Sequence, residues 1–393
     1  MRYTLPVIVI SQFLCTTLWF VGNAVMPEVV KAFDLGELYF AHQTSAVQFG
    51  FISGTLVFAL LTIADRFSPS RVFFVSAVLA AAFNLAILSE VNTGFSILAL
   101  RYLTGFFLAG IYPVGMKIAS DYFEKGLGKS LGFLVGALVL GTAFPHLLRG
   151  YLSGYPWQYV IGAASALALI GGLLMILFVP DGPHRRQAGK MEMSVVFKVF
   201  HSRPFRSAAF GYFGHMWELY TFWAFVPVML AAYAGKHADL GWSVSELSFA
   251  IIGVGSLACV GAGYVSMKIG ERTTAVLALA ASGVCCLLSP VMFGVDSPAL
   301  FLGFLVFWGI VVIADSPMFS TLVAKNTHPQ QRGTALTFVN CIGFFITIVS
   351  IQVLGRLSVM VDTSFLFLFL SLGPALGLIA LARGRTPADE STL

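Results

Sequence analysis

Twelve stretches of mostly apolar residues follow one another along the chain, separated by short polar loops. A helix needs about 20 apolar residues to cross the hydrocarbon core of a bilayer, and each of these stretches is that long. The pattern therefore predicts an all-α integral membrane protein with twelve transmembrane helices. The expected spans are residues 5–30, 41–63, 71–89, 95–118, 128–149, 157–180, 206–233, 245–267, 273–293, 298–323, 333–354 and 364–382.

The composition excludes a water-soluble fold. Hydrophobic residues make up 58% of the 393 residues and charged residues only 10%, whereas soluble domains carry roughly 25% charged residues. The net charge of +5 is spread over loops that flank the spans, so it does not indicate nucleic-acid binding. All five cysteines lie in apolar stretches and are expected to be small buried hydrophobic residues without disulfides.

The polar stretch 181–205 is the longest in the chain and separates six spans from six. We predict an N-terminal six-helix bundle (1–180), a cytoplasmic linker (181–205) and a C-terminal bundle with a short cytoplasmic tail (206–393). Seventeen Lys and Arg residues flank the spans on the side of the linker and the termini, against four on the other side. Under the positive-inside rule this predicts cytoplasmic termini in a cytoplasmic (inner) membrane.

Two polar loops about 200 residues apart resemble each other. The first is Leu61–Arg71 (LTIADRFSPSR) and the second is Gly263–Arg272 (GYVSMKIGER). Each follows a long apolar run, precedes another, and places basic residues on a tight turn. Such a repeat suggests two homologous halves around a central cavity, an organisation found in many transporters.

The six-plus-six arrangement, the basic central linker and the repeated loop resemble the major facilitator superfamily over nearly the whole chain. In that family the loop reads Gly, three residues, Asp, a basic residue, Gly and further basic residues. Two residues depart from the pattern. Leu61 stands where the first copy should have its initial glycine, and Met267 stands where the second copy should have its acidic residue. The residues that fit it are Asp65, Arg66, Arg71, Gly263, Lys268, Gly270 and Arg272.

The resemblance implies that this loop acts as a cytoplasmic gate. Asp65 would pair with a basic residue of the facing half when the cytoplasmic side is closed, and would release it on opening. The alternative is that these charges only anchor loops and set topology, since exposed ion pairs contribute little free energy.

Four ionisable residues stand out inside the expected spans, namely Arg101, His215, Glu218 and Asp315. A charge there costs about 2.5–3.5 kcal/mol or more at the bilayer centre. Counted at about 1.5 Å per residue from the nearest basic loop residues, the last three lie near the midplane, and Arg101 lies closer to the outside. His215 and Glu218 are three residues apart and share a helix face.

The resemblance implies that helices 1, 4, 7 and 10 line the central cavity. A carboxyl group in a low-dielectric setting exchanges a proton more readily near neutral pH than one in water. Our hypothesis is that Glu218, assisted by His215, carries the coupling proton, and that Asp315 binds substrate or shares the proton. The alternative is a static Glu–His or Asp–Arg pair that holds helices together.

Arg101 begins a stretch rich in small residues that resembles the family's helix 4 motif. There the Arg contributes to proton coupling or binds an anion, and a structural role is equally open. Packing is favoured for its glycines. Seven further residues are candidates for lining the cavity, and helix–helix hydrogen bonds or ordinary packing are the alternative roles for them. These are Trp19, Asn23, Gln48, Tyr112, Tyr220, Trp223 and Asn340.

These observations predict a monomeric secondary active transporter that moves a small solute by alternating access, coupled to protons and without a cofactor. One alternative is a divalent metal transporter that uses His215, Glu218 and Asp315 as ligands. Another is a non-transporting membrane receptor. An enzyme is not expected, because the loops are too short to build a water-exposed site. His215, Glu218 and Asp315 suit a cationic solute, whereas Arg101 suits an anion. The residues therefore identify neither the substrate nor the direction of transport.

Overall fold

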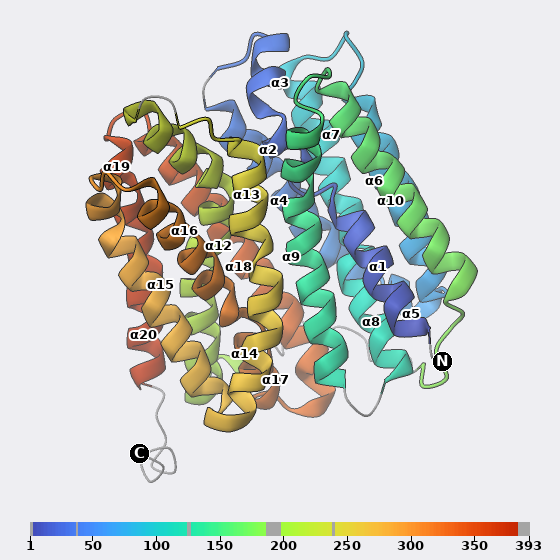
Figure 1. Cartoon of the computed structure of the whole chain (residues 1–393). Helices are drawn as coiled ribbons and strands as arrows, with labels where there is room; N and C mark the ends of the chain where they lie inside the picture. The colour runs from blue at the N-terminus through green and yellow to red at the C-terminus, as the bar shows by residue number, and fades with distance from the viewer. Residues whose placement is uncertain (1–2, 37, 124–126, 186–197, 238–239, 384–393) are drawn as a thin grey trace. The chain divides into compact units, whose positions relative to one another are not determined.

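The computed structural model describes residues 3–36, 38–123, 127–185, 198–237 and 240–383 (Figure 1). Residues 186–197 of the predicted linker and residues 384–393 of the predicted tail lie outside these ranges. So do five basic residues that counted toward the predicted orientation, namely Arg2, Lys125, Arg186, Lys190 and Arg385. Every regular element in the described ranges is a helix, which confirms the all-α fold.

In the described ranges, ten helical segments are long and apolar enough to cross a membrane. They are α4 (Tyr39–Leu60), α6 (Pro69–Ala86), α7 (Gly94–Leu108) with α8 (Tyr112–Tyr122), α9 (Leu127–Tyr151), α10 (Gln158–Phe178), α13 (Val244–Gly253) with α14 (Gly255–Ile269), α15 (Glu271–Phe293), α16 (Pro298–Ala314) with α17 (Ser316–Lys325), α18 (Arg332–Leu357), and α19 (Thr363–Leu366) with a 3-10 turn (Phe367–Ser371) and α20 (Leu372–Arg383).

Two further segments complete the twelve expected spans. The first is broken into α1 (Thr4–Thr16), α2 (Val21–Ala24) and α3 (Met26–Ala32), and the other is the long α12 (Arg203–Lys236). The observed ends of all twelve segments lie within four residues of the expected ones. The short α5 (Ile63–Arg66) lies in the loop between α4 and α6.

Within the described residues five spans are interrupted, which the apolar pattern did not predict: the first span, α7–α8, α13–α14, α16–α17 and the last span. Three of these interruptions lie before α3, between α7 and α8, and at Asp315 between α16 and α17. At these three places the new helix carries a proline in its first turn: Pro27, Pro113 and Pro317. Proline lacks the N–H that would continue the incoming helix, but its fixed φ suits the start of a new one.

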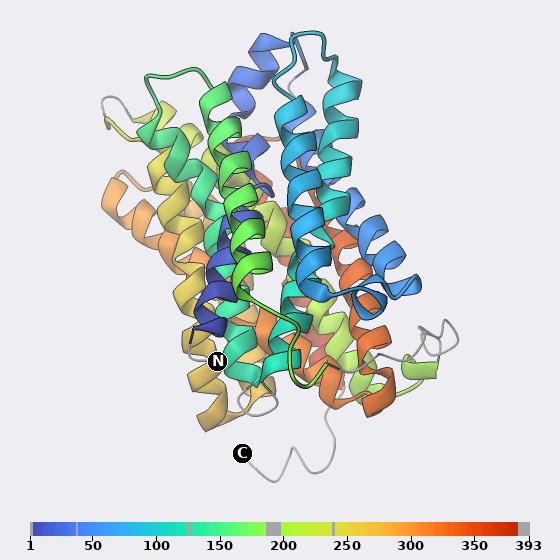
Figure 2. The same ribbon diagram turned by 90° about the vertical axis from the view of Figure 1, so that its right-hand side faces the viewer.

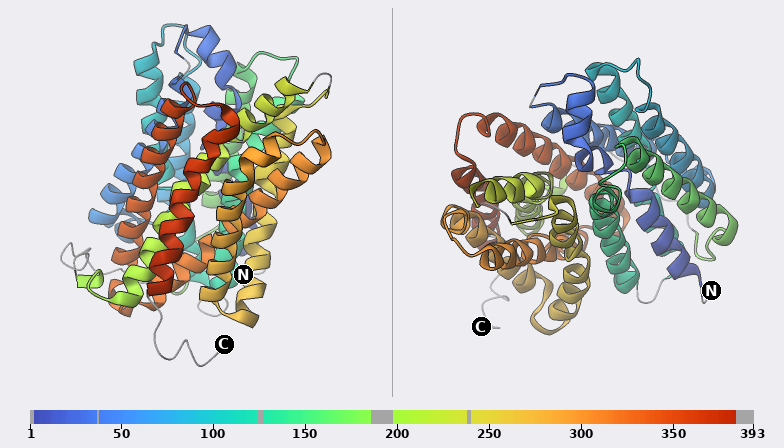
Figure 3. Two further views of the ribbon diagram at one scale, coloured as in Figure 1. Left: turned by 90° about the vertical axis from the view of Figure 1, so that its left-hand side faces the viewer. Right: turned by 45° about the horizontal axis from the view of Figure 1, so that its top comes forward.

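Contacts between Cα atoms divide the chain into two compact units. The first unit holds Met1–Lys190 with Ala224–Ser256, and the second holds Met191–Trp223 with Leu257–Leu393. This boundary passes through α12 and α14, so the division at residues 181–205 stays a prediction. Within the first unit α6 and α10 lie side by side (Figure 2). Within the second unit α15 lies beside α20 (Figure 3, left).

Glycines bring the backbones of α4 and α7 into contact in the first unit. A Cβ added at Gly50 would collide with the backbone oxygen of Tyr102, and one added at Gly105 would collide with the backbone oxygen of Val47. Small residues of this kind allow membrane helices to approach closely. Gly105 therefore packs, which is the role favoured for the glycines of its small-residue stretch.

The connection from α14 to α15 is a single residue, Gly270, with φ +84° and ψ 152°. This backbone region is essentially restricted to glycine, and another residue in it costs about 1–3 kcal/mol. We therefore expect Gly270→Ala to lower the thermal unfolding temperature of the protein purified in detergent. Gly263 in α14 is a matched control, because an added Cβ meets no atom within 4 Å at either position. Gly263→Ala should not lower that temperature, since alanine favours helix. Equal melting of the two variants would contradict the expectation.

Candidate functional site

A buried histidine and a buried aspartate meet in the second unit. Nδ1 of His215 on α12 lies 2.7 Å from Oδ1 of Asp315, and each side chain is only 1% exposed. The rings of Tyr212 and Phe319 lie 5.9 Å and 6.0 Å from the imidazole ring. An imidazole and a carboxylate at this distance can share or exchange a proton.

Asp315 owes its position to the helix break. It is the single residue between α16 and α17, and Ser316 and Pro317 directly after it start α17. Non-helical backbone at membrane depth is tolerated where it is buried in protein or lines a water-filled cavity. Among the described residues, Oδ2 of Asp315 and Nε2 of His215 have no hydrogen-bond partner. Buried polar atoms are normally paired, so both atoms call for a water molecule or a polar group of a solute.

Glu218 lies three residues beyond His215 on α12 but has different partners. Trp308 Nε1 donates to its Oε1 at 2.6 Å, Cys286 Sγ donates to the same oxygen at 3.3 Å, and Ser282 Oγ donates to Oε2 at 2.8 Å. Ser282 and Cys286 come from α15, and Trp308 comes from α16. The structure therefore pairs His215 with Asp315, and surrounds Glu218 with neutral donors.

Arg101 on α7 binds the break in the first span. Its Nη2 donates to the backbone oxygens of Leu18 and Trp19 at 3.1 and 2.7 Å, and its Nη1 donates to Oδ1 of Asn84 at 3.1 Å. Leu18 and Trp19 lie between α1 and α2, where helical carbonyls lose their usual partners. The side chain is 1% exposed. All three acceptors are uncharged, so this arrangement supports the break directly.

The first copy of the repeated loop is braced by basic residues of its own unit. Oδ1 of Asp65 lies 2.9 Å from Nζ of Lys117 on α8. Arg185 donates to the backbone oxygens of Asp65 and Phe67 at 3.0 and 2.8 Å. The expected partner was a basic residue of the facing half, whereas this partner belongs to the same half. The gate role of the loop stays a proposal.

The remaining gate candidates lie at the ends of helices. Arg66 Nε donates to Thr62 Oγ1 at 3.1 Å, and Arg71 is exposed near the start of α6. In the second copy Lys268 is exposed near the end of α14, and Arg272 donates to the backbone oxygen of Leu381. The second copy is thus tied to the last helix of its own unit.

Two of the candidate cavity residues of the first unit take part in contacts between helices. Asn23 Nδ2 donates to Thr44 Oγ1 at 2.8 Å and Asn23 Oδ1 accepts from Gln43 Nε2 at 3.0 Å, which joins α2 to α4. The ring of Trp19 lies 4.7 Å from that of Phe51. Gln48 on α4 is fully buried, and Tyr112 is the first residue of α8.

In the second unit the candidate aromatic residues form one cluster. The ring of Tyr220 lies 5.1 Å from the rings of both Trp223 and Phe344. Asn340 is half-buried on α18. Sequence reasoning missed Ser282, Cys286 and Trp308 because none of them is charged. A weak indication was available, since Ser282 and Cys286 are four residues apart and therefore share a helix face.

The part of the chain that the structure describes contains no cluster of ligands for the metal alternative. No three His, Cys, Asp or Glu side chains gather there in a way that could hold a metal ion. His215 and Asp315 meet, but the oxygens of Glu218 accept hydrogen bonds from other residues.

Comparison with known proteins agrees with the fold. The family model of the Major Facilitator Superfamily matches residues 8–351. A bicyclomycin resistance protein homolog of Haemophilus influenzae is 21% identical over 328 residues, which cover 81% of this chain and 80% of the relative.

Two solved structures share the fold at low sequence identity. The nucleoside transporter NupG has a TM-score of 0.74 at 15% identity, over 97% of this chain and 99% of that one. A bacterial homolog of the human lysosomal transporter Spinster, in an inward-facing and unoccupied conformation, has a TM-score of 0.71 at 15% identity, over 98% and 96%. Since the family model spans most of the chain, this protein belongs to the Major Facilitator Superfamily and is a membrane transporter, not an enzyme.

Proposed function

We propose that the protein is a proton-coupled secondary transporter that moves a small organic solute by alternating access. We place it as a monomer in the cytoplasmic membrane, and the distribution of Lys and Arg supports termini on the inside. The observation that carries the proposal is the buried His215–Asp315 pair at a helix break, which has polar atoms left unpaired.

Proton coupling follows from the charge of this pair. The pair is neutral overall when it holds one proton, and it gains a net positive charge when it takes up a second. A buried net charge is costly unless a partner compensates it. Uptake of the second proton is therefore favoured when the site is open to water or when a solute supplies the compensating group. Solute and proton then alter each other's affinity, which is the linkage that a coupled carrier requires.

Glu218 is the second candidate proton carrier in this proposal. It lies on the same face of α12 as His215, and its hydrogen bonds from Ser282 and Trp308 fix the position of the carboxyl group. Arg101 has less support as a coupling residue, because the carbonyls of the broken first span already accept its hydrogen bonds.

The relatives suggest which solutes to test. One is named for bicyclomycin resistance and one structural neighbour is named as a nucleoside transporter. We propose transport of a drug-like or nucleoside-like molecule as the first candidate activity.

The test uses purified wild-type protein in liposomes with an imposed proton gradient. A thermal-shift screen at acidic and at neutral pH, with nucleosides, bicyclomycin-type antibiotics and divalent cations, first identifies a stabilising ligand. Flux of that ligand is then measured together with internal pH. We expect solute movement to require the gradient and to carry protons. Equal flux with and without a gradient would overturn proton coupling, and stabilisation by divalent cations alone would favour the metal alternative.

A further inference from the structure

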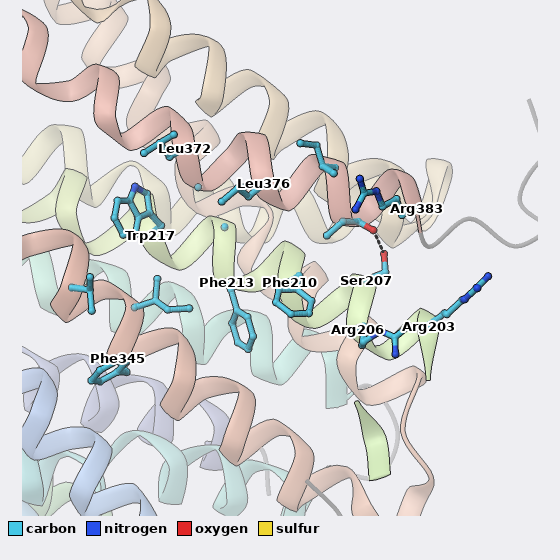
Figure 4. Close-up of a pocket in the computed structure, with 16 residues that line it drawn as sticks. Arg203, Arg206, Ser207, Phe210, Phe213, Trp217, Phe345, Leu372, Leu376 and Arg383 are labelled. Carbon is cyan, nitrogen blue, oxygen red and sulfur yellow. Dashed lines mark hydrogen bonds between the residues drawn. The ribbon is translucent and has the colours of Figure 1, made fainter. Parts of the chain in front are cut away.

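A hollow of about 1030 Å³ opens on the second unit between α12, α18 and α20 (Figure 4). Most of its wall is apolar and consists of side chains that the protein leaves uncovered. Phe210 on α12 is 48% exposed, Phe345 on α18 is 57% exposed and Leu376 on α20 is 66% exposed. The hollow therefore offers a continuous apolar surface to whatever lies beside these helices.

Glycines create the space at the base of the hollow. Gly214 on α12 and Gly373 on α20 both line it, and a Cβ added at either would collide with the backbone oxygen of the other. The two helices thus touch through their backbones, and the larger side chains stand on either side of the contact. Trp217 closes the far end, where its Nε1 donates to the backbone oxygen of Phe369 at 3.2 Å.

Three arginines surround the other end of the hollow. Arg203 and Arg206 come from the start of α12, and Arg383 comes from the end of α20 (Figure 4). Arg203 and Arg383 are exposed. Ser207 lies between them and donates to the backbone oxygen of Ala380 at 3.0 Å, which ties the two helices together at this end. None of the described residues that line the hollow is acidic, so this end is strongly positive.

The length of the hollow matches one leaflet of a bilayer. Arg203 and Trp217 are fourteen residues apart on α12, which corresponds to about 21 Å at about 1.5 Å per residue. Half of a bilayer, including its headgroup region, is about 20–22 Å thick. The arginines thus lie at the depth of the phosphates when Trp217 lies near the midplane.

We propose that the hollow is a binding site for one anionic phospholipid. The phosphate lies at Arg203, Arg206 and Arg383, and an acyl chain runs along α12 towards Trp217. Guanidinium groups suit this role because they can bind a phosphate through two parallel hydrogen bonds. The distribution of basic residues places this end in the cytoplasmic leaflet, which is the leaflet that carries anionic lipids.

The test measures lipid binding to the full chain by native mass spectrometry in mild detergent, with phosphatidylglycerol or phosphatidylcholine as the added lipid. The variant R203Q/R206Q/R383Q should bind phosphatidylglycerol on the order of 100-fold more weakly, since each basic residue contributes roughly fivefold. The matched control K198Q/K325Q/R332Q removes three positive charges from the same unit outside the hollow. It should bind phosphatidylglycerol as the wild type does.

A second variant tests the apolar part and leaves the charges in place. Leu376→Trp puts a bulky side chain into the hollow from an exposed position, so it should fold and still weaken phosphatidylglycerol binding at least tenfold. Wild-type binding of phosphatidylcholine as tight as that of phosphatidylglycerol would overturn the proposal. So would equally tight binding of glycerol phosphate, because the apolar wall would then contribute nothing.

Discussion

Replacing Asp315 with asparagine is expected to abolish proton-driven accumulation of solute while exchange of solute across the membrane continues. Asparagine nearly preserves the shape of the side chain, but it replaces the carboxylate that lies 2.7 Å from Nδ1 of His215 with an amide that does not take up a proton. Without a titrating partner the site can still bind and release solute, yet the proton gradient no longer drives it. The measurement compares uptake under a pH gradient with counterflow in the absence of a gradient. The internal solute concentration should fall to the external value.

Two further variants make this result specific. Asp296→Asn removes a carboxylate of the same unit from an exposed loop and should leave accumulation unchanged. The double variant His215→Gln/Asp315→Asn removes both members of the pair, so no buried charge is left uncompensated. It should melt closer to the wild type than Asp315→Asn does and should still fail to accumulate solute. Full accumulation by Asp315→Asn would move the coupling role to Glu218, with Glu218→Gln as the next variant.

Replacing Arg101 with leucine should deprive the protein of much of its stability. The side chain satisfies two carbonyls at the break of the first span and the amide oxygen of Asn84, all within hydrogen-bond distance. Each buried acceptor left without a donor costs about 1–3 kcal/mol. Three of them amount to several kcal/mol, against a total stability of about 5–15 kcal/mol for a typical protein. The thermal unfolding temperature and the yield of monodisperse protein in detergent measure the loss.

Arg149→Leu is the matched control for this variant. Arg149 pairs with Glu28 and donates to the backbone oxygens of Leu152 and Tyr155. These groups are partly exposed, so water can replace the side chain and its loss should cost about 0–1 kcal/mol. Arg101→Lys should recover part of the stability, because an ammonium group can donate to some of the same acceptors. If Arg101→Leu melts like the wild type and loses only proton-driven transport, Arg101 is a coupling residue and its structural role is minor.

The ends of the spans could be predicted because they depend on the length of each apolar run, which the sequence displays directly. The breaks could not. Pro27, Pro113 and Pro317 begin new helices, whereas Pro145, Pro227 and Pro290 lie inside helices that continue past them. A break also requires neighbouring elements that satisfy the freed backbone groups, as Arg101 does for Leu18 and Trp19 between α1 and α2, where no proline stands. That information comes from the packing of other spans.

The charged members of the candidate site could be found because a charge stands out in an apolar span. Their pairing could not be found. His215 and Glu218 share a helix face, yet one binds Asp315 and the other binds Ser282 and Trp308. Which partner each side chain meets depends on the rotation of α15 and α16 about their own axes. The apolar pattern leaves that rotation open, because these helices are apolar nearly all round.

The glycine contacts between α4 and α7 restrict how the first unit can move during a transport cycle. At Gly50 and Gly105 each backbone already touches the other helix, so a small translation along the seam would drive a carbonyl into the opposing chain. Shear between packed helices requires side chains that can re-seat after sliding, and here no side chain separates the two backbones. We infer that α4 and the adjoining part of α7 travel as one rigid pair, and that bending of the α7–α8 span is concentrated where α7 ends and α8 begins.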